Sequence, residues 1–510
     1  MLAKTLAAAV LGVEALPIEV EVDLAFGQLP VFTIVGLPDG TVRESKERIA
    51  AAFANSGLAL PVRRITVNLA PAELRKVGSG FDLPIAAALL GATGLVPAEA
   101  LDGLMWVGEL SLDGRIRPVR GVLAIALKAR AMGLRGLVLP RENEMEGGIA
   151  SGLTLYPIER LEEAVKLLRG ESVPASRPAH AETWFAEEQA PGEDLRDVKG
   201  QEQIKRALEI AAAGNHHLLM LGPPGSGKTM LARRLNGILP RLTFEEALET
   251  TRIHSIAGQL TAERPFVTQR PFRAPHHSVS PAGLVGGGSI PQPGEISLSH
   301  NGVLFLDELP EFPRNVLELL RQPLEDRRVT ISRAAMALEF PCSFLLVCAM
   351  NPCPCGYLGD AARRCTCPPS AVQKYRARIS GPLLDRIDLQ VDVPAAPFDK
   401  LADTRRGEPS ATVQARVQAA RERQMLRFRN SPTRNNGMMS PMEIEVFASP
   451  PPEGIALLRR ASERLGLSAR AYTRILKVAR TIADLADSPL LQTAHLAEAI
   501  QYRKLDRPAG

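Results

Sequence analysis

The chain has 510 residues, of which 45% are hydrophobic and 23% are charged, and its formal net charge at pH 7 is +5. This composition is ordinary for a soluble globular protein, and the length predicts about three domains. No apolar run approaches the roughly 18 residues of a membrane-spanning helix, so the sequence excludes one. The mild positive charge permits nucleic-acid binding but does not establish it.

The first 170 residues alternate between strand-like and helix-like segments. Glu14 interrupts the apolar start of the chain, and residues 18–23 alternate apolar and acidic side chains like a half-buried strand. We therefore expect a first strand rather than a signal peptide, and a cytoplasmic protein. Asp113 and Gly114 predict a hairpin turn. Further strands are expected at 31–35, 64–68 and 136–139, and helices at 41–56, 84–90 and 121–132. Residues 1–170 thus predict an α/β domain without a phosphate loop.

The rest of the chain divides by composition. Residues 171–193 are rich in proline and glutamate and lack apolar periodicity, which predicts a flexible linker. Residues 194–395 return to an α/β pattern. Residues 396–510 predict a helical lid domain. Its expected helices lie at 412–428, 453–464, 468–486 and 493–503.

The most informative segment is GPPGSGKT, a complete G-x-x-x-x-G-K-[ST] loop between an apolar strand-like run and a helix-like run. Its glycines let successive backbone N–H groups surround phosphate oxygens, and the helix N-terminus adds a partial positive charge. We expect Lys228 to bind the β- and γ-phosphates of ATP and the Thr229 hydroxyl to bind Mg²⁺. The predicted phosphate-binding residues are Gly222, Pro223, Pro224, Gly225, Ser226, Gly227, Lys228 and Thr229.

A second acidic motif, GVLFLDE, occupies residues 302–308. Its apolar run predicts a buried strand. Asp307 at the strand end can hold Mg²⁺, and Glu308 can act as general base toward the water that attacks the γ-phosphate. Alone, the two acids could be a solvated strand end. Together with the phosphate loop they predict an ATPase.

The connection between these motifs, residues 240–300, is long and rich in proline, glycine and histidine, which is typical of a functional insertion. Within it, His276 and His277 could bind a metal but more simply position a loop. Residues 327–340 predict a β-hairpin with Arg333 near its tip. The next apolar strand leads to Asn351, whose side chain could orient the attacking water or cap a turn.

All six cysteines lie between residues 342 and 367. This clustering argues against a disulfide framework, which would spread along the chain. Four thiolates in two tight pairs can close a tetrahedral structural Zn²⁺ site. The C-x-C spacing differs from the commoner C-x₂-C, so reduced cysteines in a turn are the alternative. The candidate ligands are Cys353, Cys355, Cys365 and Cys367.

Two arginines of the second half could serve a nucleotide. Arg386 lies on a short turn between apolar segments and could reach the γ-phosphate of a neighbouring subunit. It could instead form a surface ion pair with Asp385 or Asp388. Arg470 begins the second helix of the lid's all-helical part, from which it could reach back to the nucleotide.

These motifs together resemble those of AAA+ ATPases, and more closely the Mg-chelatase-like YifB/ComM family. The resemblance covers nearly the whole chain and is most specific at residues 35–39, 273–277, 351–356, 383–388 and 497–502. It implies hexameric rings, with Arg333 on a hairpin that enters the central channel. It further implies Walker A at 222–229, Walker B at Asp307 and Glu308, sensor 1 at Asn351, an arginine finger in trans at Arg386, sensor 2 at Arg470 and a helix-2 insertion within 240–300.

The first domain resembles the ribosomal-S5-domain-2-like fold shared with Lon protease and RadA. Lon-like proteolysis needs a Ser–Lys dyad, but Asp82 occupies the nucleophile's place and apolar residues follow Gly121 where the lysine would fall. The resemblance therefore implies the fold without the activity, and Ser79 is expected in a turn. A DNA-contacting or ring-stabilising role fits better. Its candidate basic contacts, unless they form only a solvated rim, are Arg63, Arg64, Arg75 and Lys76.

The resemblance to the ComM branch implies branch migration of DNA during natural transformation, performed by a cytoplasmic Mg·ATP-driven hexamer. A pore that grips a DNA backbone needs positive charge, for which Arg333 is the candidate. The motor motifs do not distinguish DNA from a protein substrate. The alternative function is therefore a chelatase-type ATPase that remodels a partner protein. No membrane partner is expected.

Overall fold

The computed structural model describes residues 1–25, 31–171, 173–176, 193–261, 263–288, 291–333, 336–360, 363–395 and 406–503. The chain divides into two compact units, Met1–Glu188 with Phe244–Thr268, and Gln189–Thr243 with Gln269–Gly510. Most of the predicted linker at 171–193 lies outside the described residues. Within the described ranges, no helix has both the length and the hydropathy needed to cross a bilayer.

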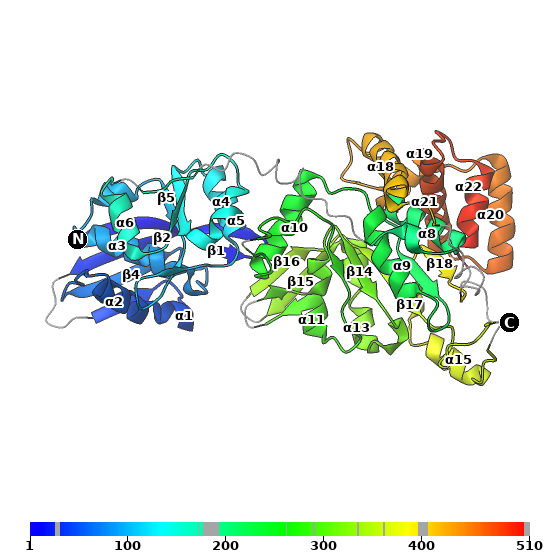
Figure 1. The fold of residues 1–510 in the computed structure, drawn as a ribbon, viewed down its shortest axis with the longest axis horizontal. Helices are drawn as coiled ribbons and strands as arrows, with labels where there is room; N and C mark the ends of the chain where they lie inside the picture. The colour runs from blue at the N-terminus through cyan, green and yellow to red at the C-terminus, as the bar shows by residue number, and fades with distance from the viewer. Residues whose placement is uncertain are drawn as a thin grey trace. The chain divides into compact units, whose positions relative to one another are not determined.

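A seven-stranded mixed sheet is the centre of the first unit (Figure 1). Its strand order is β3-β4-β2-β1-β5-β8-β9. β2 pairs antiparallel with β1 and with β4, whereas the other neighbours are parallel. The strands are β1 (Leu2–Leu11), β2 (Glu14–Ala25), β3 (Val31–Val35), β4 (Arg64–Ala70), β5 (Leu104–Trp106), β8 (Gly136–Pro140) and β9 (Leu155–Ile158). The start of the chain is thus a strand, as its sequence predicts.

Helix α3 (Asp82–Ala92) packs on β1 and β2, and all 11 of its residues are buried. A helix that is apolar all round needs cover on every side, which explains its central place. The short strands β6 (Glu109–Leu110) and β7 (Ile116–Arg117) form the predicted hairpin around Asp113 and Gly114. The other helices are α1 (Gly40–Arg43), α2 (Ser45–Asn55), α4 (Val122–Ala131), α5 (Glu144–Gly148) and α6 (Leu161–Leu168).

Helix α10 (Phe244–Ile256) belongs to the first unit although it follows the phosphate loop in sequence. Its Ser255 hydroxyl donates to the buried Glu146 carboxylate at 2.5 Å, and Leu123 donates its amide to the same carboxylate at 2.9 Å. Burial raises the pKa of Glu146. The predicted ATPase core at 194–395 includes residues 244–268. In the structure, these residues belong to the first unit. The grouping of residues 244–268 with the first unit depends on contacts between segments far apart in sequence, such as Ser255 with Glu146. The hydrophobic periodicity of the sequence does not encode such contacts.

A five-stranded parallel sheet is the core of the second unit, in the order β11-β14-β17-β10-β18. β10, the earliest of these strands in sequence, lies between β17 and β18. The residues of β10, β14 and β17 are all buried, so these strands are unbroken apolar runs. The strands are β10 (Leu218–Leu221), β11 (Phe272–Arg273), β14 (Val303–Leu306), β17 (Leu345–Met350) and β18 (Leu389–Asp392).

Short helices and a hairpin complete this core. β15 (Arg328–Arg333) pairs antiparallel with β16 (Met336–Pro341), which confirms the predicted hairpin. Arg333 stands opposite Met336 at its end, and its side chain lies outside the described part. The helices are α8 (Glu202–Gly214), α9 (Lys228–Leu235), α11 (Pro281–Val285), α12 (Glu295–Leu298), α13 (Arg314–Glu318), α14 (Arg321–Asp326), α15 (Pro369–Arg376) and α16 (Gly381–Leu384).

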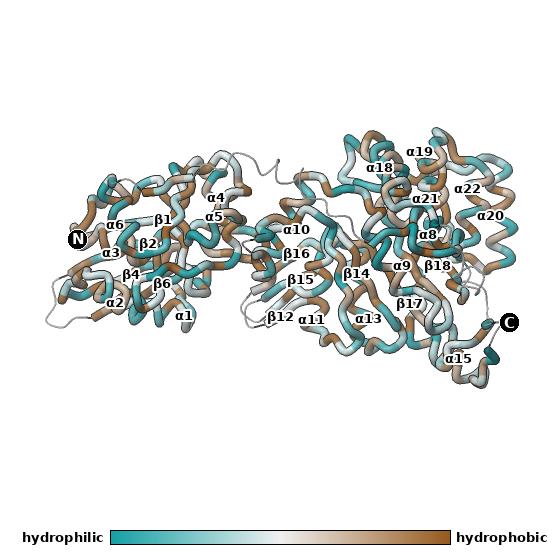
Figure 2. Tube along the Cα trace, viewed as in Figure 1, coloured by the Kyte–Doolittle hydropathy of each residue, from teal (hydrophilic) through white to brown (hydrophobic). Residues whose placement is uncertain are grey.

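The C-terminal part, which we call the lid, is helical as predicted, and the four expected helices form within two residues of the predicted ends. Teal and brown positions alternate along α20 in Figure 2, as in an amphipathic helix. Such a helix buries one stripe against its neighbours. The helices are α18 (Ser410–Arg427), α19 (Pro441–Phe447), α20 (Pro452–Leu465), α21 (Ala469–Leu485) and α22 (Thr493–Gln501).

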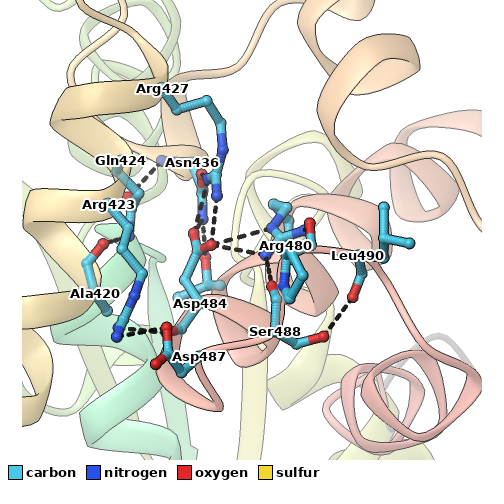
Figure 3. A network of polar contacts seen from close by, with 12 residues as sticks. Ala420, Arg423, Gln424, Arg427, Asn436, Arg480, Asp484, Asp487, Ser488 and Leu490 are labelled. Carbon is cyan, nitrogen blue, oxygen red and sulfur yellow. Dashed lines mark hydrogen bonds and ion pairs between the residues drawn. The ribbon is translucent and has the colours of Figure 1, made fainter.

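A buried carboxylate joins the lid helices α18 and α21 (Figure 3). Asp484 is 1% exposed and accepts hydrogen bonds from Arg427 at 2.5 and 2.8 Å and from Arg480 at 2.8 and 3.2 Å. The side-chain amide of Asn436 donates to the same carboxylate at 2.7 Å. A buried charge needs this full set of partners, so the network fixes how the two helices pack.

We expect Asp484→Asn to lower the free energy of unfolding by about 3–5 kcal/mol, because it leaves two partly buried guanidinium groups without their acid. Asp487→Asn is the matched control, since the Asp487 side chain is 77% exposed in its ion pair with Arg423. The control should cost less than about 1 kcal/mol. Urea denaturation followed by circular dichroism measures both changes. Equal, small losses would contradict a structural role for the network.

Candidate active site

The phosphate loop joins β10 to α9 at the carboxyl edge of the parallel sheet, where ligands of such sheets bind. Gly225 and Gly227 have φ angles of +76° and +87°, which a side chain would strain. A Cβ on Gly222 would lie 2.1 Å from the carbonyl oxygen of Val393. The glycines of the motif are therefore required by the fold as well as by the phosphate.

Lys228 folds back over this loop. Its ammonium donates to the carbonyls of Gly222 at 2.8 Å and Pro223 at 2.9 Å, and to Asn351 Oδ1 at 3.3 Å. Burial lowers the pKa of Lys228, while Asp307 and Glu308 partly oppose this effect. An anionic phosphate would replace neutral carbonyl partners with a charged one, which favours the ammonium form.

The predicted Walker B acid lies against the loop. β14 pairs in parallel with β17, which pairs with β10, so the ends of these three strands lie side by side. Thr229 Oγ1 donates to Asp307 Oδ2 at 2.5 Å, and the Glu308 amide donates to Asp307 Oδ1 at 2.9 Å. A hydroxyl and a carboxylate are oxygen donors of the kind that Mg²⁺ prefers, and an ion bound by both would replace their direct hydrogen bond.

Glu308 stands in the left-handed region, with φ of +51°. Its carboxylate lies 3.7 Å from Nδ1 of His277, a residue that follows β11. His277 packs edge-on against the ring of Phe312 at 6.4 Å and stacks near His276 at 4.0 Å between centroids. The sequence predicts that these histidines position a loop, and it does not indicate their proximity to Glu308. The pairing depends on β11 lying beside β14, which local sequence does not indicate.

The phosphate loop and the Walker B acids line a common cavity of about 420 Å³. It is lined by most of the phosphate loop together with Asp307, Glu308 and Asn351, so the structure brings both predicted Walker motifs and the predicted sensor to one place. Asn351 follows the last residue of β17, and its amide oxygen accepts from Lys228. The cavity can hold a phosphorylated ligand with an acid beside its terminal phosphate.

Arg386 and Arg470 do not line this cavity. Arg386 is buried, donates to the carbonyl of Pro382 at 2.6 Å and forms an ion pair with Glu325. Arg470 is exposed near the same acid. The ion pair with Arg386, followed by weaker contributions that include Arg470, lowers the pKa of Glu325. Within one chain, Arg470 therefore does not line the nucleotide cavity that the sequence suggested it could reach.

The four predicted metal ligands form one cluster directly after Asn351. Their Sγ atoms all lie within 4.8 Å of one another, and separations of 3.4 and 3.6 Å join Cys353 to Cys355 and to Cys365. The Cys355 amide donates to Cys367 Sγ at 3.3 Å. Gly356 closes against the phosphate loop, since a Cβ there would lie 2.5 Å from Pro224 Cδ. The cluster therefore supports the loop and the sensor from one side.

The first unit lacks a protease dyad at the place that the Lon-like resemblance marks. Asp82 is fully buried and accepts from the Ser45 hydroxyl at 2.5 Å and from the Arg48 guanidinium at 2.7 and 2.9 Å. It is therefore part of a structural ion pair. Ser79 contacts Glu109.

One predicted basic contact of the first unit is wrong. Lys76 is fully buried and donates to the carbonyl of Pro71, so it is no surface contact. Arg64 and Arg75 are exposed and Arg63 is partly exposed, as a contact role requires.

Three families of known proteins match consecutive parts of the chain. Residues 194–401 match magnesium chelatase subunit ChlI, residues 20–143 match subunit ChlI of Mg-chelatase, and residues 407–503 match the C-terminal part of magnesium chelatase subunit ChlI. YifB of Escherichia coli is 47% identical over 98% of this chain and 96% of its own length. The chain belongs to the Mg-chelatase-like YifB/ComM family.

Other relatives agree with this family. The competence protein ComM of Haemophilus influenzae is 46% identical over 98% of this chain and 96% of its own. Lon protease 2 of Bacillus subtilis is 31% identical over 159 residues, which are 28% of this chain and 27% of the protease. The Mg-chelatase-like family implies ATP and Mg²⁺ as ligands. The mixed α/β fold with an AAA+ core, a Lon-like part and a helical C-terminal region is confirmed.

We expect Lys228→Ala to weaken ATP binding at least about tenfold, since it removes a charge-assisted contact worth more than about 1.4 kcal/mol. Lys374→Ala, at an exposed position of α15, is the matched control and should bind ATP normally. Titration with a fluorescent ATP analogue measures both affinities. Unchanged affinity in Lys228→Ala would reject the phosphate loop as the nucleotide site.

Proposed function

We propose that this chain is a cytoplasmic, Mg·ATP-dependent motor that works as a hexameric ring on DNA and drives branch migration in homologous recombination during natural transformation. The convergence of Lys228, Asp307, Glu308 and Asn351 on one cavity carries the ATPase part of this proposal. The DNA part rests on the 46% identity with a competence protein over nearly the whole chain.

Each residue of the cavity has a chemical role. Lys228 exchanges the loop carbonyls for the β- and γ-phosphates of ATP. Thr229 and Asp307 hold Mg²⁺, which neutralises phosphate charge when bound. Glu308 accepts a proton from the attacking water, and Asn351 orients that water. His277 lies beside the Glu308 carboxylate.

The positions of the remaining arginines support a ring. Neither Arg386 nor Arg470 lines the cavity of its own chain, which supports a trans role for Arg386 and leaves the sensor-2 role of Arg470 to the assembled ring. Arg386 exchanges its ion pair with Glu325 for the neighbour's γ-phosphate, as an arginine finger does. Arg333 on the β15–β16 hairpin contacts the DNA backbone in the channel.

The cysteine cluster holds a structural Zn²⁺ ion. A tetrahedral site with Zn–S bonds of about 2.3 Å has S···S edges of about 3.8 Å. The separations of 3.4 to 3.6 Å among Cys353, Cys355 and Cys365 fit this geometry. Four thiolates leave no position for a substrate, so the ion stiffens the segment that follows Asn351.

The purified chain should contain one zinc per chain, and the double variant Cys365→Ser with Cys367→Ser should lose it, because two ligands cannot retain the ion. Cys348→Ala, in the buried strand β17, is the control and should keep its zinc. Metal analysis by mass spectrometry measures all three proteins. Substoichiometric zinc in the unmodified chain would reject the site.

We expect single-stranded or forked DNA to stimulate ATP hydrolysis, and we expect the stimulation to fall steeply between about 50 and 200 mM salt, because phosphate contacts release counterions.

Glu308→Gln should bind ATP and DNA yet hydrolyse at least about 100-fold more slowly, since it lacks the general base. A coupled ATPase assay at both salt concentrations measures the rates.

If DNA neither binds the chain nor stimulates its ATP hydrolysis, the DNA motor is overturned. Retained ATP hydrolysis in that case would favour the remodelling of a partner protein. Normal turnover in Glu308→Gln would instead remove Glu308 from the role of base.

A further inference from the structure

A second polar cavity, of about 210 Å³, lies at the opposite edge of the parallel sheet, where its strands begin. His217 precedes β10, Phe344 precedes β17 and Asp388 precedes β18, and all three line it. The lid helix α21 adds Arg474 and Lys477. The four residues of β10 span about 13 Å, so this cavity is separate from the nucleotide cavity at the other end of the strand.

Arg327 is a half-buried cation of this cavity. It joins α14 to the hairpin strand β15, and its φ of +55° is an uncommon backbone conformation for arginine. Among the described residues, its guanidinium has no hydrogen-bond or ion-pair partner. Burial, with a further contribution from Arg434, lowers the pKa of Arg327. The base of the hairpin thus carries a charge that nothing in the described part of the chain neutralises.

Lys477 is the second half-buried cation. Its ammonium donates to the carbonyl of Gly437 at 3.1 Å. Burial lowers the pKa of Lys477 to about 8, with Asp388 and Glu443 acting against this effect and Arg474 and Arg327 adding to it. Burial disfavours the charged form of this lysine, and an anionic partner would stabilise that form.

His217 supplies a neutral donor. Burial lowers its pKa to about 4, so the ring is uncharged at neutral pH. Its Nδ1 accepts the amide of Leu346 at 3.1 Å. The ring proton therefore resides on Nε2.

The acids of the cavity are already engaged. Asp388 is 3% exposed, forms an ion pair with Arg474, and accepts the His217 amide at 3.0 Å. Glu325 forms its ion pair with Arg386. Among the described residues, neither acid forms an ion pair with Arg327 or Lys477, so the cavity carries an excess of positive charge and of hydrogen-bond donors.

We propose that this cavity binds a phosphate group between Arg327 and Lys477. A dianion with several acceptor oxygens matches two cations and the donor set around them. Arg327 belongs to the base of the β15–β16 hairpin and Lys477 to the lid, so the bound anion ties these two elements together. The phosphate can come from free phosphate or pyrophosphate, or from the backbone of a nucleic acid. The proposal is independent of the nucleotide site.

The test measures binding of pyrophosphate by calorimetry and by the rise in melting temperature, in the Lys228→Ala chain so that the phosphate loop does not contribute. Pyrophosphate should bind this chain. Adding Arg327→Gln with Lys477→Met should weaken that binding at least tenfold. Adding Arg328→Gln, an exposed neighbour paired with Glu339, should leave it unchanged.

A structural role is distinguished in phosphate-free buffer. If the cavity is built for an anion, Arg327→Gln with Lys477→Met relieves charge repulsion and should not lower the melting temperature there. A lower melting temperature together with unchanged pyrophosphate binding would overturn the proposal, as would the absence of binding to Lys228→Ala.

The source of the phosphate is decided by competition. A single-stranded oligonucleotide that displaces pyrophosphate from the Lys228→Ala chain, but not from the chain that also carries the cavity substitutions, identifies a nucleic-acid backbone as the ligand. Pyrophosphate binding that the oligonucleotide leaves unchanged identifies free phosphate. An effect of the cavity substitutions on subunit assembly alone, without pyrophosphate binding to either chain, would reject the site.

Discussion

The parallel register of β14, β17 and β10 is the constraint on which the candidate active site depends. Three strands that end together bring Asp307, Asn351 and the phosphate loop to one edge although they are far apart in sequence. The hydrogen bonds of Lys228 to Asn351 and of Thr229 to Asp307 then join those ends. A slip of one strand would separate the acids from the loop, so the sheet core and the chemistry are specified together.

The sequence predicted those features that a short segment encodes. The phosphate loop, the apolar strands, the β15–β16 hairpin and the lid helices all carry local signals, namely glycine positions, runs and periodicity. Features that depend on distant contacts were not predicted. The sequence places helix α10 in the ATPase core, whereas the contact of Ser255 with Glu146 places it in the first unit. The proximity of His277 to Glu308 depends on the pairing of β11 with β14, which no local pattern indicates.

The polar contacts of the lid continue into the sheet. Asn436, a partner of Asp484, also donates to Thr481 at 3.0 Å, and Thr481 contacts His216 Nε2 at 2.7 Å. His216 Nδ1 lies 3.6 Å from Asp388 at the start of β18. The lid therefore contacts, through His216, the sheet edge where β10 and β18 begin.

The grouping of residues 244–268 with the first unit has a consequence for dissection of the chain. The chain passes between the two units at residues 188–189, 243–244 and 268–269, so three covalent crossings connect them. A fragment that begins at residue 194 would retain α10 without the buried Glu146 that it meets in the whole chain. A boundary at residue 194 would thus expose the face of α10 that is buried in the whole chain, and aggregation of such a fragment would not report on the stability of the second unit.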